Sequence, residues 1–143
     1  MTVIDNNAMI RATLDARADA IRNKDVQKVI DLFAPESARF TPDPSPQSLE
    51  SLGKEMEEWF STWEGPIGYE VSGLSIATDD KVAFCHSQGH YTGTKTDGDT
   101  PDVWFRETLC LRKLNGRWLV TNVHESAPFH MDGSWKPATV LQP

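Results

Sequence analysis

Hydrophobic residues recur with two different spacings along the 143-residue chain, and the spacing changes near residue 67. In the first part they stand three or four positions apart, as on one face of an amphipathic helix. This pattern predicts helices over residues 5–23, 26–33 and 48–63. From residue 67 onward, apolar and polar residues alternate, which is the period of a strand with one buried face. We expect strands at 38–41, 67–78, 81–94, 102–114 and 117–128.

The order of these elements predicts the fold class. Three helices followed by an antiparallel meander indicate an α+β domain, in which the helices cover the concave face of a curved sheet. The length suits one domain, so residues 1–143 are interpreted as a single domain. The last two strands form a hairpin at Asn115-Gly116, a dipeptide that supplies the positive φ of a tight turn.

The register of this hairpin decides which side chains face the helices. With a three-residue loop at 114–116, the helix-facing rows are Phe105, Glu107, Leu109 and Leu111, and Leu119, Thr121, Val123 and Glu125. We prefer this register because it brings the more apolar rows together on the buried face. A two-residue loop would pair the rows oppositely. In the preceding strand, the concave face is assigned to Ala83, Cys85, Ser87, Gly89 and Tyr91.

Charge and composition exclude several classes of function. The formal net charge is -7 and the basic residues are scattered, so we expect no nucleic-acid partner and no binding to an anionic membrane. The first 22 residues have no continuous apolar core, so they are neither a signal peptide nor a membrane span. A cytoplasmic protein is therefore expected.

Metal and disulfide chemistry are not expected either. His86 and His90 stand four residues apart on a strand, roughly 13 Å, which is too far to share one ion. Cys85 and Cys110 point to opposite faces of the sheet and should not bridge. We expect no metal and no other cofactor.

The end of the chain carries a family resemblance. The pattern is Arg106-x-Thr108, then Asn115-Gly116-Arg117-Trp118, then His124-x-Ser126-x-Pro128. Together with the order of the elements, it resembles the nuclear-transport-factor-2-like superfamily, and most closely its SnoaL-like group of small bacterial proteins. It is also similar to the association domain of calcium/calmodulin-dependent kinase.

This resemblance implies a cone-shaped α+β fold with a pocket between sheet and helices, and a homodimer formed through the outer face of the sheet. Ketosteroid isomerase, scytalone dehydratase and polyketide cyclases share the fold. The Asp and Tyr partners of the isomerase have no clear counterparts in this sequence, which argues against steroid isomerisation. Fold by itself does not imply function.

Two carboxylates are the first candidates for catalysis. In the preferred register, Glu107 and Glu125 are diagonal neighbours on the pocket face. An apolar pocket and a neighbouring like charge both disfavour ionisation, so one of them could act as a general base near neutral pH. The alternative is that each forms an ion pair with a helix cation such as Arg11, Arg17 or Arg22.

His124 is the competing acid/base candidate. Regular alternation places it on the outer face beside Arg106, where a polar dimer interface is the preferred interpretation. A strand bulge that turned His124 inward would make it the better candidate.

Aromatic and small residues define the expected ligand pocket. Indole and phenol rings at a cavity mouth bind a flat apolar ligand well, although helical spacing alone is more often a sign of core packing. The predicted ligand contacts are Phe40, Trp59, Trp63, Ser87, Tyr91, Phe105 and Val123. We therefore expect a protein that binds a small apolar metabolite, and the enzyme classes that fit are an isomerase, cyclase or dehydratase that abstracts a proton. The alternative is a binding or oligomerisation module without turnover.

Overall fold

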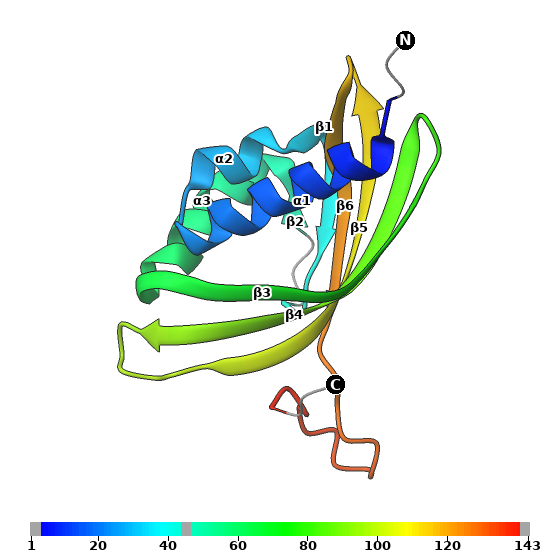
Figure 1. Cartoon of the computed structure of the whole chain (residues 1–143). Coiled ribbons are helices and arrows are strands. Elements are labelled where there is room, and N and C mark those ends of the chain that lie inside the picture. Colours follow the sequence, from blue (N-terminus) through cyan, green and yellow to red (C-terminus); the bar gives the residue numbers. More distant parts are fainter. Residues whose placement is uncertain (1–3, 44–46, 141–143) are drawn as a thin grey trace.

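The computed structural model describes residues 4–43 and 47–140 (Figure 1). Its helices are α1 (Asn6–Arg22), α2 (Val26–Asp31) and α3 (Leu49–Ser61). The first two begin after an aspartate that caps the helix. The side chain of Asp5 accepts a hydrogen bond from the backbone N–H of Ala8, and that of Asp25 accepts one from Lys28.

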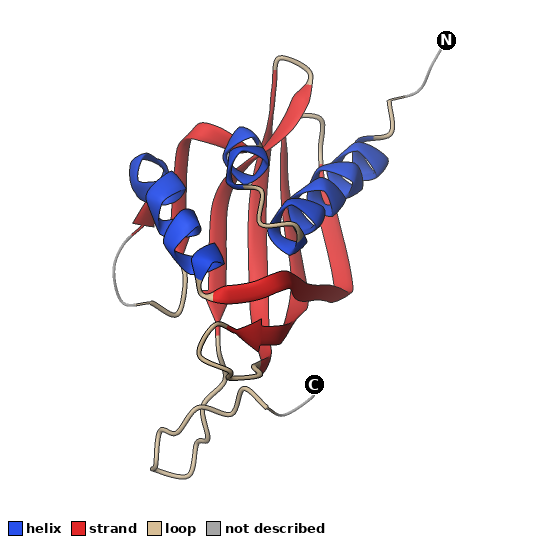
Figure 2. Ribbon diagram, turned by 90° about the vertical axis from the view of Figure 1, so that its left-hand side faces the viewer, coloured by secondary structure: helices blue, strands red, loops and turns tan. Residues whose placement is uncertain are grey.

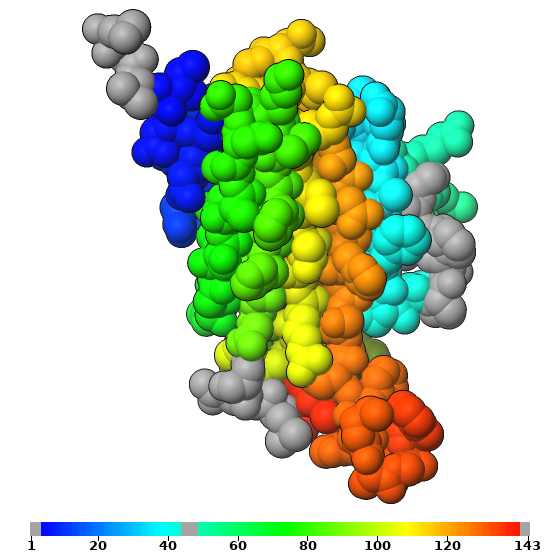
Figure 3. Space-filling view, turned by 90° about the vertical axis from the view of Figure 1, so that its right-hand side faces the viewer, coloured from blue at the N-terminus to red at the C-terminus, as the bar shows by residue number. Residues whose placement is uncertain are grey.

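One six-stranded sheet forms the other layer. Its strands are β1 (Phe33–Phe40), β2 (Gln47–Ser48), β3 (Trp63–Thr78), β4 (Val82–Lys95), β5 (Asp102–Leu114) and β6 (Arg117–Ser126), in the order β2-β1-β6-β5-β4-β3. Neighbouring strands are antiparallel except β1 and β6, which are parallel. The helices lie on the concave face of the curved sheet (Figure 2), and the strands themselves form the outer face (Figure 3). The predicted α+β fold is confirmed.

Two element boundaries differ from the prediction. Phe33 was expected to end the second helix but begins β1, where it pairs with Val120. Trp63 was expected to end the third helix but begins β3, where it pairs with Lys95. Both aromatic rings are buried between helices and sheet, so strand pairing and burial together outweigh the helical spacing of the sequence.

The loop of the last hairpin is shorter than expected. It holds two residues, Asn115 and Gly116, both with positive φ, and Leu114 pairs directly with Arg117. The predicted three-residue loop is therefore wrong. Asn-Gly adopts the tight turn that matches the twist of the two strands.

A β-bulge in β6 compensates for this shorter loop. Leu111 pairs with Val120, whereas Cys110 pairs with Asn122, so Thr121 is an extra residue in the ladder. Its side-chain hydroxyl donates a hydrogen bond to the backbone carbonyl of Cys110. Further along the strand, the bulge restores the facing that a three-residue loop would have produced, although the pairs differ and Glu107 pairs directly with Glu125.

The bulge changes which residues of β6 face the helices. Before it, Trp118 and Val120 are buried and Leu119 is only half-buried, opposite to the prediction for this part of the strand. After it, Val123 is buried and Glu125 lies on the same face, as predicted. Both halves of β6 thus direct large side chains toward the helices.

The hydrophobic core lies between the helices and the concave face of the sheet. Ile10, Leu52 and Phe60 are among its fully buried helix residues. Cys85 is buried on this face and Cys110 is half-buried on the other, and both are free thiols. The prediction that they do not form a disulfide is confirmed.

Candidate functional site

A cavity of about 720 Å³ opens between the helices and the sheet. All three helices contribute to its walls, together with β1, the start of β3, β4, β5 and β6. The segment after β6 reaches it through Ala127 and Thr139. Cavities of this size hold drug-sized ligands.

Five of the predicted ligand contacts line this cavity: Trp59, Trp63, Tyr91, Phe105 and Val123. The rings form one continuous wall. The Trp59 ring meets Trp63 edge-on at 5.8 Å and Tyr91 at 5.4 Å, and Tyr91 stacks on Phe105 at 4.7 Å between ring centroids. Offset and edge-on pairs of this kind present flat apolar surface to a ligand.

Two other predicted contacts are placed elsewhere. Phe40 follows the inward-facing Arg39 on β1, so alternation turns its side chain to the outer face, where it is 52% exposed and lies 5.9 Å from the His124 ring. Ser87 faces the helices but is buried beside Glu107, its partner on β5, and neither side chain lines the cavity. Ser87 is buried in the packed core, so the cavity does not extend to it.

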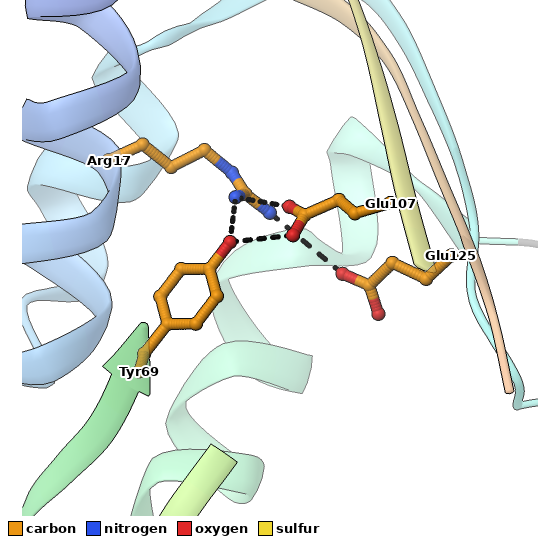
Figure 4. Close-up of polar contacts among 4 residues, drawn as sticks. All are labelled: Arg17, Tyr69, Glu107 and Glu125. Atoms are coloured by element: carbon orange, nitrogen blue, oxygen red, sulfur yellow. Dashed lines mark hydrogen bonds and ion pairs between the residues drawn. The ribbon is translucent and has the colours of Figure 1, made fainter. Parts of the chain in front are cut away.

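The two candidate carboxylates are direct partners across β5 and β6 rather than diagonal neighbours. Glu107 is almost fully buried, and Arg17 from α1 donates to its Oε1 at 2.7 Å. The hydroxyl of Tyr69 donates to its Oε2 at 2.6 Å and accepts from Arg17 at 3.2 Å (Figure 4). The alternative interpretation, an ion pair with a helix arginine, therefore holds for Glu107.

Glu125 is in a different position. Its nearest cation is the same Arg17, at 3.9 Å from Oε1, and its side chain is 15% exposed on the cavity wall. Burial and the neighbouring negative charge of Glu107 raise the pKa of Glu125 to about 7, although Arg17 and Arg39 act in the opposite direction. The pair is thus divided into one carboxylate fixed by hydrogen bonds and one that faces the cavity.

His124 lies on the outer face, as the preferred interpretation expected. It pairs with Thr108 on β5 and with Phe40 on β1, and its side chain is exposed. The bulge lies ahead of it, at Thr121, and leaves it pointing outward. The structure therefore separates His124 from the cavity.

Sequence reasoning missed three polar residues of this region. Tyr69 is the hydrogen-bonding partner of Glu107, and the alternation of Ile67 and Tyr69 on β3 was the available signal for it. Arg39 is buried on the cavity wall and forms an ion pair with Glu55. Lys95 lies over the Trp63 ring at the end of β4. Long-range contacts place each of these residues, so no short sequence motif predicts them.

Within residues 4–43 and 47–140, no cluster of three or more His, Cys, Asp or Glu side chains is arranged to hold a metal ion. In the same part of the chain, none of the helices has the length and hydrophobicity that a bilayer span requires.

The sequence profile of the SnoaL-like domain matches residues 10–130, which is most of the chain. The chain belongs to the SnoaL-like domain family. The matched region of this SnoaL-like protein begins within α1 and ends just after β6, so it contains every residue that lines the cavity except Thr139. No curated protein matches the sequence.

Solved structures share the fold of this SnoaL-like protein. A nuclear-transport-factor-2-like protein of unknown function from Pseudomonas putida has a TM-score of 0.84 and 23% identity, over 99% of this chain and 100% of that one. A ketosteroid isomerase-like protein from Erwinia carotovora has a TM-score of 0.74 and 22% identity, over 87% and 97%. A Xanthomonas campestris protein provisionally named a calcium/calmodulin-dependent protein kinase II association domain has a TM-score of 0.76 and 24% identity, over 87% and 89%. At these identities the likeness shows the fold alone.

Proposed function

We propose that this protein binds a small, flat, mostly apolar carbonyl compound in its cavity and that Glu125 moves a proton on the carbon beside the carbonyl. The observation that carries the proposal is the position of Glu125. It is a carboxylate on the wall of an aromatic cavity, with a second carboxylate behind it that is already bound by Arg17 and Tyr69.

The arrangement assigns separate roles to the two carboxylates. Glu107 forms an ion pair with the buried guanidinium of Arg17 and contributes negative charge beside Glu125. A general base is most effective when its pKa lies near the working pH, and a value of about 7 for Glu125 meets this condition. Above this pH the carboxylate of Glu125 removes the proton from carbon, and the protonated form returns it at another position.

The rest of the cavity supports an enolate-like intermediate. Removing the proton places negative charge on the carbonyl oxygen of the ligand, which a nearby donor stabilises. Tyr91 lines the same cavity as Glu125, and its phenol is near enough for the charge of Glu125 to act on it. Tyr91 also stacks on Phe105, so a flat ligand that lies along these rings brings its carbonyl group to the polar end of the cavity.

Deuterium exchange tests this proposal without knowledge of the natural substrate. The probe is 2-tetralone, a flat bicyclic ketone with acidic C–H groups beside its carbonyl, and NMR follows exchange in D2O. We expect the protein to accelerate exchange, with a rate that rises with pH through about 7. Glu125→Gln should lower the enzymatic rate by about a hundredfold or more.

The matched control is Glu70→Gln, which changes an exposed carboxylate on β3 away from the cavity and should leave exchange unchanged. Calorimetric binding of 2-tetralone to both variants separates a loss of chemistry from a loss of binding. Exchange that is no faster than in buffer, or that is equally fast in Glu125→Gln, would contradict the proposal.

A second proposal concerns self-association through the outer face. Phe40 on β1 and Val82 and Phe84 on β4 are each at least half exposed there, and large exposed apolar side chains on one face are typical of interaction surfaces. We propose that two copies of the chain pair through this face. Light scattering after size-exclusion chromatography should show a dimer for the natural chain and a monomer for Phe84→Asp. A monomeric natural chain would exclude the dimer.

A further inference from the structure

The rim of the cavity carries a cation, Lys95, with the charges of Asp97 and Asp99 nearby but beyond ion-pair distance. Lys95 ends β4, and its Nζ lies 4.0 Å from the centroid of the Trp63 ring. The ammonium donates one hydrogen bond, to the hydroxyl of Thr62 at 2.7 Å, which leaves two of its three N–H groups. Among the described residues Lys95 forms no ion pair.

Beside it lies a buried donor without an acceptor. Trp63 is 4% exposed, and no acceptor in the described part of the chain bonds its indole Nε1. The Cε3–Cζ3 edge of the ring packs closely against Gly93, so the edge that carries Nε1 points away from β4. A buried donor left without a partner costs about 1–3 kcal/mol, so an acceptor atom from a ligand would be stabilised there.

These donors lie far along β4 from the position of Glu107 and Glu125. Glu107 pairs with Ser87 on β4 and with Glu125 on β6. Lys95 is eight residues further along the same strand, roughly 26 Å of extended backbone. The aromatic wall of Tyr91 occupies the space between. The cavity therefore has one end where Glu125 and Glu107 stand beside Arg17 and Arg39, an aromatic middle, and another end where Lys95 lies; Asp43 and Glu58 also line it.

We propose that the cavity takes a flat aromatic ligand that carries a carboxylate, with the carboxylate held at the mouth by Lys95 and the indole N–H of Trp63. This inference rests on the proposed use of the cavity for a flat ligand and specifies the charge of that ligand. In the opposite orientation the ligand carboxylate would meet Glu125 and Glu107, which repel it, and the cations there, Arg17 and Arg39, already pair with Glu107 and Glu55. The carbonyl end of the ligand thus meets Glu125, and its anionic end meets Lys95.

Calorimetric titration of two compounds with the same shape tests this inference. The probes are 2-naphthoate and its uncharged counterpart 2-naphthamide. We expect the natural chain to bind the acid about tenfold more tightly, the effect of one charge-assisted hydrogen bond at a partly exposed site. Added salt should weaken binding of the acid and leave binding of the amide unchanged.

Three variants locate the effect. Lys95→Gln should abolish the preference for the acid, whereas Lys95→Arg should retain it. The matched control is Lys113→Gln, because Lys113 also lies over an indole ring, that of Trp118, but away from the cavity. This control removes the same charge from the chain and should keep the preference.

Equal affinity for acid and amide in the natural chain would overturn the inference, and so would an unchanged preference in Lys95→Gln or the failure of both compounds to bind. The result is independent of the proposed chemistry. A protein that exchanges 2-tetralone without preferring the acid would contradict only the present inference. A protein that prefers the acid but exchanges nothing would contradict only the role of Glu125.

Discussion

Replacing Glu125 with glutamine should stabilise the folded protein at alkaline pH and leave it almost unchanged in acid. The ordinary pKa of a glutamate, 4.5, applies in the unfolded chain, whereas burial and Glu107 raise the pKa of Glu125 to about 7 in the native state. Between these values the native state binds more protons than the unfolded chain. The free energy of unfolding therefore falls as the pH rises from 4.5 to about 7, and the loss is complete above that.

The size of this loss follows from the two pKa values. Each pH unit between them contributes about 1.4 kcal/mol, so the natural chain loses about 3 kcal/mol across the whole interval. Glutamine has nearly the same shape but no charge, so Glu125→Gln avoids the loss. The stability difference between the variant and the natural chain should grow by roughly 2 to 3 kcal/mol from pH 5 to pH 8.

Urea unfolding followed by tryptophan fluorescence measures this difference at each pH, and the five tryptophans supply the signal. Glu70→Gln is again the control, because it removes an exposed carboxylate on β3 that lies away from the cavity. If the difference for Glu125→Gln were equally flat from pH 5 to pH 8, the account of Glu125 as a buried, charge-disfavoured carboxylate would be wrong.

Three further predictions concern the surroundings of the cavity. Glu107→Gln should destabilise the protein by about 3–5 kcal/mol in urea unfolding, because it removes the close ionic partner of the buried Arg17; a loss below 1 kcal/mol would contradict this. In Gly89→Ala the new Cβ would lie 2.2 Å from Cζ of Phe105, so the ring must shift, and we expect a thermal-unfolding loss of about 1–3 kcal/mol together with weaker binding of 2-tetralone. Burial raises the pKa of Cys85 to about 11, so 5,5′-dithiobis(2-nitrobenzoate) should modify this thiol only after unfolding. Rapid modification of Cys85 in the native protein would refute its burial.

Much of the fold could be predicted from the spacing of hydrophobic residues alone. The change from helical to alternating spacing near residue 67 located the layers, and Asn115-Gly116 located the last turn. The errors occurred where tertiary pairing outweighs local pattern. Phe33 and Trp63 continue a helical spacing in the sequence, yet each becomes the first residue of a strand because its backbone finds a partner in the sheet.

The candidate site could be predicted only in part. Alternation correctly placed Glu107 and Glu125 on the concave face, although their predicted pairing assumed the wrong loop length and omitted the bulge. The composition of the sequence could not show which carboxylate Arg17 would bind, since that depends on how α1 lies across β5. Lys95 lies on a strand that was predicted to end one residue earlier, so its place at the cavity mouth had no local signal.

The extra residue at Thr121 has a consequence for how this fold tolerates changes in chain length. The side chains that face inward on either side of Thr121 keep this direction because Thr121 is left without a partner in the strand pairing. Deleting Thr121 would leave the pairs Leu111–Val120 and Leu109–Val123 in register, so Glu125 would still face inward. The strand would lose its local bend instead. A change of one residue in chain length here thus alters the bend of the strand, while the same side chains keep facing the helices.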